Sequence, residues 1–319
     1  MTLRSLRTVL AVAVAVLGYA TIVVWGLGLV LHDRWGWSQW LSWIPAPVVA
    51  IALLMGAVFV RVLGGARQSG HASRLGWVAA AAVGWTVHAS LGWSQPPDGR
   101  DRSVRLLQWN TDWPSGDDPR SAAALARTPA DIVLNSNCGR VMSPEAVAAW
   151  APEGARAFFA GPFALVTSWP VLEARAVAAG GSGRQFWYIA RFVVMPPGWH
   201  GVPLRIAMVD LPSRPTLPKR EIAAAVAQAC VSGGLGEVDI VAGDFNAIDG
   251  SVILERGFPG FRDALVEAGR GWLCTWPRAL PLWKIDHVLV GPDVRAIDAS
   301  VLDPGTSHHR MTQVDVELR

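Results

Sequence analysis

The chain has 319 residues, of which 51% are hydrophobic and only 17% are charged. This length accommodates one sizeable domain plus a further segment, and the apolar content excludes a disordered polar chain. Residues 1–98 hold six arginines and two aspartates, whereas residues 99–319 are near neutral. A near-neutral domain argues against a broad basic surface for gripping nucleic acid. Three cysteines without a CxxC pair exclude a disulfide scaffold but leave one disulfide open.

The N-terminal third contains three apolar stretches, at about 8–31, 41–62 and 75–93. At a rise of about 1.5 Å per residue, stretches of this length cross a hydrocarbon core of about 30 Å. We therefore predict three transmembrane helices in a membrane anchor over residues 1–95, followed by a polar linker over residues 96–103. A cleaved signal peptide is the competing interpretation of the first stretch, because Arg4 and Arg7 precede it.

Arginines mark one side of the predicted anchor: Arg4 and Arg7 precede the first stretch, and Arg61, Arg67 and Arg74 follow the second. Positive residues near membrane spans favour the cytoplasmic side. Three crossings then place the remainder of the chain outside the cytoplasm. We expect a multi-pass protein of the cell membrane, with the lipid bilayer as its partner and an extracytoplasmic C-terminal domain.

Residues 104–319 alternate apolar strand-like runs with helical segments. The runs 104–109 and 131–134 predict buried strands with an alanine-rich helix between them, and 238–242 predicts a short buried strand. Several adjacent strands with few helices indicate two packed sheets flanked by helices rather than a doubly wound parallel sheet. The sequence therefore predicts an α/β domain.

Polar side chains follow several of these predicted strands. Asp244 and Asn246 come directly after the run 238–242, two residues apart and hence on one side of extended backbone. Such a pair could position a phosphate and a water, although Gly-Asp-x-Asn is also ordinary chemistry for a turn. Other polar side chains at predicted strand ends are Asn110, Asp112, Asp286 and His309.

In order and spacing these motifs resemble the endonuclease/exonuclease/phosphatase superfamily, which has the DNase I-like fold. The elements that carry the resemblance are Trp109-Asn110, Gly243-Asp244-Phe245-Asn246, Ile285-Asp286-His287 and Ser307-His308-His309. The resemblance implies that residues 104–319 form a four-layer α/β sandwich with two central, mostly antiparallel sheets. It also implies hydrolysis of phosphate esters with a divalent metal, usually Mg²⁺.

The resemblance assigns a role to each polar side chain of these motifs. His309 matches the general base that activates the attacking water, and Asp286 matches the acid that orients it. Asp244 and Asn246 match the pair that positions the nucleophile and the scissile phosphate. Asn110 matches the first-motif asparagine and is, with Asn246, a predicted substrate-binding residue.

Three positions depart from the family pattern. Asn137 stands where the family has its principal metal-binding glutamate, and His308 replaces an aspartate. Asp210 replaces the phosphate-binding histidine, and we keep it as a predicted substrate-binding residue. Because hard cations favour anionic oxygen ligands, the losses weaken an Mg²⁺ site unless Asp112 or Asp210 substitutes. We keep Asp112, Asn137 and His308 as candidate metal residues, and His308 leaves Mn²⁺ or Zn²⁺ open.

Two functions fit this sequence. The first is a membrane-anchored hydrolase of phosphate esters, a phosphodiesterase or phosphatase acting outside the cytoplasmic membrane. Lipid headgroups or small phosphoesters are its favoured substrates, and nuclease action stays open. The second is a catalytically inactive family member that serves as a binding or scaffolding module. We favour the enzyme, because Asp244, Asn246, Asp286 and His309 are all present together. Lys284, beside Asp286, is interpreted as a solvated strand-end lysine.

Overall fold

The computed structural model describes residues 3–95, 103–114, 118–182, 185–214 and 216–319. The predicted linker over residues 96–103 lies, except for its last residue, outside the described residues. The chain divides into two compact units. The first comprises Met1–Leu91 with Pro218–Arg220, and the second comprises Gly92–Leu217 with Glu221–Arg319.

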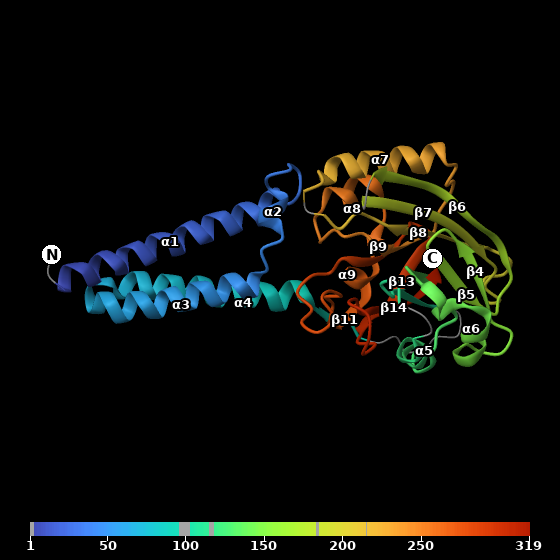
Figure 1. Cartoon of the computed structure of the whole chain (residues 1–319), viewed down its shortest axis with the longest axis horizontal. Helices are drawn as coiled ribbons and strands as arrows, with labels where there is room; N and C mark the ends of the chain where they lie inside the picture. Colours follow the sequence, from blue (N-terminus) through green and yellow to red (C-terminus); the bar gives the residue numbers. More distant parts are fainter. Residues whose placement is uncertain (1–2, 96–102, 115–117, 183–184, 215) are drawn as a thin grey trace. The chain divides into compact units, whose positions relative to one another are not determined.

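The first unit is helical. Its elements are α1 (Leu3–Leu31), α2 (Gln39–Ser42), α3 (Ala46–Gly64), the 3₁₀ turn η1 (Gly65–Gln68) and α4 (Ser69–Ser90). The helices α1, α3 and α4 run side by side (Figure 1), and Leu53, Val60 and Leu75 are buried between them. The reversal between α3 and α4 begins at Gly65, whose φ of 59° suits a residue without a Cβ.

Among the described residues, two helical segments, not the three predicted, are long and apolar enough to cross a membrane: Leu3–Leu31 and Ala46–Ser90. The second segment contains α3, η1 and α4, because helical turns continue through the reversal. The predicted stretch 75–93 ends early, since Leu91–Trp93 forms strand β1 and joins a sheet. Signal sequences and buried core helices share such length and composition, so these segments establish apolar helices rather than a membrane topology.

The second unit contains two sheets. The eight-stranded sheet has the order β1 (Leu91–Trp93), β11 (Gly269–Trp272), β13 (Val294–Leu302), β14 (Met311–Leu318), β2 (Val104–Asn110), β3 (Ile132–Ser136), β5 (Phe163–Thr167), β4 (Arg156–Ala160). The six-stranded sheet has the order β10 (Arg262–Asp263), β12 (Asp286–Val290), β9 (Ile240–Asp244), β8 (Leu204–Asp210), β7 (Gln185–Val194), β6 (Val171–Ser182). Both sheets are mixed, since β2 pairs with β3, β11 with β13 and β8 with β9 in parallel. The prediction of an α/β domain with two sheets is confirmed.

Helices accompany these sheets in the second unit. They are α5 (Pro119–Ala126), η2 (Gly139–Met142), α6 (Pro144–Trp150), α7 (Lys219–Ser232), α8 (Val252–Gly257) and α9 (Ala264–Ala268). Short polar caps begin several of them: Ser143 and Ser251 accept backbone N–H bonds at the starts of α6 and α8. The three cysteines are free thiols.

The alternation of side chains along β8 determines which face of the sheet Asp210 lies on. On β8, Ile206 and Met208 pack in a core that both sheets share, whereas Ala207 and Val209 pack in the core that contains α7. Successive side chains of a strand point to opposite faces. Asp210, the last residue of β8, therefore continues the face of Ile206 and Met208, toward the core between the sheets.

Candidate functional site

Three carboxylates lie in one row across the six-stranded sheet. Asp210 is the register partner of Asp244 in the parallel pair of β8 and β9. Asp244 is in turn the register partner of Asp286 in the antiparallel pair of β9 and β12. Register partners on adjacent strands share a face, with Cβ atoms about 4.5–5.5 Å apart. The ends of three strands thus bring together three acidic side chains that are far apart in the sequence.

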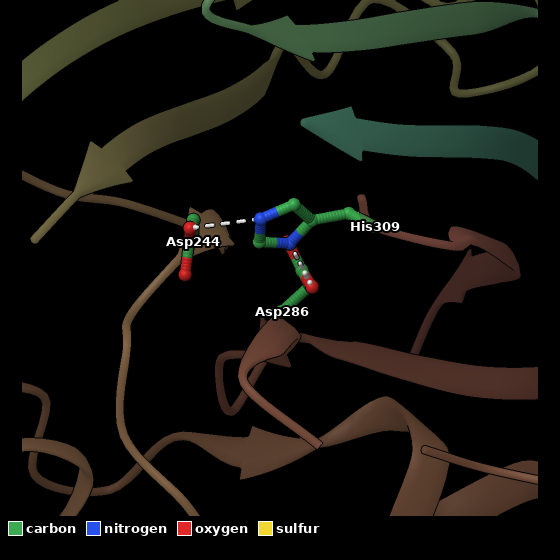
Figure 2. Close-up of side chains that lie close together, drawn as sticks. All are labelled: Asp244, Asp286 and His309. Atoms are coloured by element: carbon green, nitrogen blue, oxygen red, sulfur yellow. Dashed lines mark hydrogen bonds and ion pairs between the residues drawn. The ribbon is translucent and has the colours of Figure 1, made fainter. Parts of the chain in front are cut away.

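His309 faces two members of this row (Figure 2). Its Nδ1 lies 3.0 Å from Asp286 Oδ2, and its Nε2 lies 3.8 Å from Asp244 Oδ2. The loop before β14 is held in place by Ser307, whose Oγ donates to the Asn110 carbonyl at 2.8 Å and accepts from the His309 N–H at 3.1 Å. His309 and Asp286 therefore form an ordered pair that leaves Nε2 toward Asp244.

Two asparagines hold the Asp244 carboxylate. Asn110 Nδ2 donates to Asp244 Oδ2 at 2.9 Å, and the Asn246 N–H donates to Asp244 Oδ1 at 2.9 Å. The Asn246 backbone adopts a φ of 47°, a left-handed conformation that asparagine tolerates better than most residues. Its carboxamide donates to the Leu211 carbonyl at 2.8 Å. The structure thus brings all five of the expected residues, Asn110, Asp244, Asn246, Asp286 and His309, to one place.

Burial and crowding shift the protonation of this group. Burial, with the nearby Asp286 carboxylate, raises the pKa of Asp244 to about 6. Burial, with the Asp244 carboxylate, raises the pKa of Asp210 to about 8. Burial alone would lower the pKa of His309, but Asp286 and Asp244 outweigh it and raise this pKa to about 10. The crowded carboxyl groups therefore resist ionisation, and His309 is the cation beside them.

The three candidate metal residues are arranged differently. The Asn137 carboxamide is buried beside the row: its Nδ2 donates to Asn110 Oδ1 at 3.3 Å, and it also bonds to Asp210. Asp112 and His308 lie at an exposed edge, where the His308 Nδ1 and an Asp112 carboxylate oxygen bond to each other. His308, which the resemblance aligns with an aspartate of the family, thus pairs with Asp112.

A second polar network lies on the opposite face of β12, and it shows that our interpretation of Lys284 is wrong. Lys284 is only 6% exposed, and its Nζ lies 2.8 Å from Asp249 Oδ1 and 3.1 Å from Asp263 Oδ2. His287 Nδ1 lies 2.6 Å from Asp263 Oδ2, and its Nε2 lies 2.8 Å from the Ala247 carbonyl. The sequence near Lys284 does not reveal these partners, because they come from other elements.

Thr275 is a further residue that the sequence analysis missed. Its Oγ1 accepts hydrogen bonds from the backbone N–H groups of Ile285 and Asp286, both at 3.2 Å. These bonds fix the start of β12 and therefore the backbone from which the Asp286 side chain extends. No motif marks Thr275, because its contribution is a contact between distant segments.

Two groups of acids and histidines could hold a metal among the described residues: Asp244 with Asp286 and His309, and Asp249 with Asp263 and His287. In the second group the Lys284 ammonium already lies between the two carboxylates, so a cation is in place. In the first group the carboxylates and the neighbouring carboxamides offer the oxygen ligands that hard divalent cations prefer. The residues of the first group therefore fit a divalent metal better.

Comparison with known sequences places this site in a family. The sequence profile of the Endonuclease/Exonuclease/phosphatase family matches residues 57–309. The chain belongs to the endonuclease/exonuclease/phosphatase family. The resemblance inferred from the strand-end motifs is thereby confirmed. No individual curated protein matches the chain.

Solved structures show the same fold at low sequence identity. An endonuclease/exonuclease/phosphatase family protein from Bacteroides thetaiotaomicron superposes with a TM-score of 0.52 and 15% identity, covering 70% of this chain and 96% of that one. A mannosyl-6-phosphatase from the same organism superposes with a TM-score of 0.54 and 14% identity, covering 67% of this chain and 99% of that one. These likenesses establish the two-sheet α/β fold of the family.

Proposed function

We propose that this protein hydrolyses phosphate esters at the site of Asp244, Asp286 and His309. Members of its family are hydrolases that act on phosphoester bonds. The observation that carries the proposal is the His309–Asp286 pair, with Nδ1 at 3.0 Å from the carboxylate and Nε2 turned toward Asp244. A histidine oriented by a buried acid is the arrangement that general-base catalysis requires.

Each side chain has a role in the proposed reaction. Asp286 accepts the Nδ1 proton of His309, so Nε2 is the ring atom that takes a proton from the attacking water. In its neutral form His309 is the base, and in its protonated form it returns the proton. Asn110 and the Asn246 backbone keep the Asp244 carboxylate in place. A divalent cation, which family members typically use, would neutralise charge on the phosphate when bound.

The favoured substrates are small phosphoesters or lipid headgroups. The residues after the apolar helices are near neutral in charge, which does not favour the broad phosphate contacts of duplex binding. Nucleic acid is kept as one arm of the test, since a local groove can be basic on a neutral domain.

We also propose a location, namely a multi-pass membrane anchor with the second unit outside the cytoplasm. Arg61, Arg67 and Arg74 gather at the end of α3, in η1 and at the start of α4. A positively charged turn between two apolar helices favours a cytoplasmic position for η1. The helix α4 would then lead from this turn to the opposite side of the membrane.

We further propose that the second unit has the four-layer arrangement of helices, sheet, sheet and helices. Three core clusters support this. One contains side chains of both sheets, a second joins the six-stranded sheet with α7 and α8, and a third joins the eight-stranded sheet with α5 and α6.

A second candidate function, an inactive binding module, is favoured by Asn137. A neutral carboxamide at the position of the family's metal-binding glutamate removes an anionic ligand. Under this alternative the protein keeps the fold and binds phosphoesters without cleaving them.

Phosphate release from a panel of substrates separates the two candidates. The detergent-solubilised full chain is incubated with Mg²⁺ and a phosphomonoester, a lipid phosphodiester, a single-stranded DNA and a duplex DNA. The hydrolase proposal predicts cleavage of at least one substrate and its loss in His309→Ala. The matched control His200→Ala, at an exposed histidine, retains native activity. Binding of a substrate without cleavage by the native protein would favour the binding module.

A further inference from the structure

Only one end of the row formed by Asp210, Asp244 and Asp286 has a basic side chain as its partner. At the Asp286 end, the His309 ring bonds to the carboxylate. At the Asp210 end, no arginine or lysine in the described part of the chain forms an ion pair with the acid. Asp210 is partly exposed, whereas Asp244 is buried. Adjacent carboxylates on neighbouring strands repel each other unless a cation or a proton lies between them.

The Asn137 carboxamide lies at the Asp210 end of the row. Its side chain is 7% exposed, and its Oδ1 has no hydrogen-bond partner among the described residues. The Nδ2 of the same carboxamide is engaged with Asn110, and the side chain bonds to Asp210. A buried amide oxygen without a donor costs free energy unless a ligand satisfies it. Asn137 therefore places a carboxamide with an unsatisfied oxygen next to Asp210.

The other carboxylate at this end of the domain is already engaged. Asp112 bonds to the His308 ring at an exposed edge, so one of its carboxylate oxygens already has a partner. In the Asp244–Asp286–His309 group, a metal would have to compete with the bond from His309 Nδ1 to Asp286. Asp244 Oδ2, by contrast, accepts one hydrogen bond, from Asn110 at 2.9 Å, and retains acceptor capacity.

We propose that a divalent cation is held between Asp210 and Asp244, with Asn137 Oδ1 as a third ligand. The acidic side chain that position 137 lacks is present at position 210, on a strand of the other sheet. Oxygen ligands alone select hard cations such as Mg²⁺ and Mn²⁺. The cation site itself does not depend on the proposed hydrolase function. Only the role of the cation, which is to bind the phosphate group, rests on that function.

Mn²⁺ binding tests the proposal without any hydrolysis. The detergent-solubilised full chain is titrated with Mn²⁺, and free Mn²⁺ is measured by electron paramagnetic resonance. The native chain binds Mn²⁺, and Asp210→Asn weakens its affinity on the order of tenfold or more, because an anionic ligand becomes neutral. Asp112→Asn, at the other candidate ligand, weakens the affinity less than Asp210→Asn does. The control Asp293→Asn removes a carboxylate from an exposed turn and leaves the affinity within about twofold.

A second variant keeps the test decisive if Asp210→Asn fails to fold, which circular dichroism in metal-free buffer reports. Asn137→Asp adds an anionic oxygen at the same place and tightens Mn²⁺ binding. Absence of Mn²⁺ binding by the native chain overturns the proposal, and so does greater loss in Asp112→Asn than in Asp210→Asn. Mn²⁺ binding that depends on Asp210, without cleavage of any phosphoester, supports this site and refutes the hydrolase proposal. Cleavage with Mn²⁺ affinity unaffected by Asp210→Asn refutes this site alone.

Discussion

At the scale of single residues, the reaction depends on how Asp286 holds the ring of His309. Asp286→Asn keeps the shape of the side chain but replaces an acceptor oxygen with a carboxamide, which no longer fixes the Nδ1 proton. We expect phosphoester hydrolysis to fall on the order of 10²–10⁴-fold, the range of general-base contributions. Initial rates of phosphate release measure this. Asp293→Asn, at an exposed turn, serves as the control, and an equal loss in both variants would contradict the role of Asp286.

Gln108 is a buried residue whose side chain works against stability. It is fully buried on β2, and neither its Oε1 nor its Nε2 has a partner among the described residues. Gln108→Met fills the same space without the unsatisfied groups, and we expect it to stabilise the protein by about 1–3 kcal/mol. Thermal melting of the detergent-solubilised chain measures the change. Gln313→Met is the control, because Gln313 donates to the Pro129 carbonyl; a lower melting temperature for Gln108→Met would show that internal water satisfies it.

A residue of the site could be predicted where a motif in the neighbouring sequence marks it. Asp244, Asn246 and His309 stand within a few residues of a buried strand, so a short motif and an alternating pattern locate them. Lys284 could not be placed in the same way. Its burial depends on Asp249 and Asp263, which arrive from other elements, and nothing local distinguishes it from a solvated lysine.

At the scale of elements, β12 joins the site to a second polar network. Asp286 faces the row of carboxylates, whereas His287, its neighbour on the strand, faces Asp263. Asp263 also accepts the Leu265 N–H at 2.8 Å and so caps α9. The network therefore connects β12, α9 and the loop that carries Asp249.

Substitution of Lys284 should lower the free energy of unfolding. Lys284→Met leaves the Asp263 carboxylate buried without its ammonium partner. Breaking a buried pair in this way costs about 3–5 kcal/mol of unfolding free energy. Denaturant titration of the full chain measures the loss. Arg295→Met breaks an exposed pair with Glu317 and is expected to cost at most about 1 kcal/mol; equal losses in the two variants would show that the Lys284 pair is not buried in solution.

The protonation of His287 gives this network a pH dependence. Both ring nitrogens face acceptors, so the ring donates twice; burial lowers its pKa, but the Asp263 carboxylate outweighs burial and raises it. A raised folded-state pKa contributes stability that is complete below about pH 6.5 and is lost as pH rises through the folded pKa. The melting temperature of the native chain should therefore exceed that of His287→Gln most at pH 5–6, and the difference should shrink toward pH 9. A difference that grows with pH would contradict a cationic His287.

Element boundaries were less predictable than element types. The buried strands β2, β3 and β9 follow from apolar runs that end in polar residues. The end of the third apolar stretch could not be predicted from the sequence. Leu91–Trp93 is equally apolar as the end of a helix and as a strand that pairs with β11. Composition cannot decide between these, since the pairing partner lies far along the chain.

At the scale of the whole molecule, the chain joins an apolar helical unit to the α/β unit that holds the site. The proposed topology places the C-terminus outside the cytoplasm and η1 inside, because of the arginines around η1. An alkaline phosphatase reporter fused after Arg319 should therefore be active, and the same reporter inserted after Gln68 should be inactive. The reverse pattern would contradict the proposed orientation.

The family and the fold could be inferred from strand-end motifs, and the distribution of charge in the site could not. The sequence shows that Asn137 and Asp210 depart from the family pattern, but only the structure shows them bonded to each other beside Asp244. Asn137, directly after β3, and Asp210, on β8, meet there because side chains of both sheets pack in one core. Such proximity is a property of the tertiary fold.

The central claim is that His309 directs water onto a phosphate ester, and oxygen transfer from solvent tests it most directly. The detergent-solubilised chain, with Mg²⁺ and the best substrate of the panel, is incubated in ¹⁸O-labelled water, and the product is examined by mass spectrometry. The account predicts one solvent oxygen in the phosphate product of the native chain and none above the buffer background in His309→Ala. Equal incorporation by the native chain and His309→Ala, or no labelled product from the native chain, would contradict it.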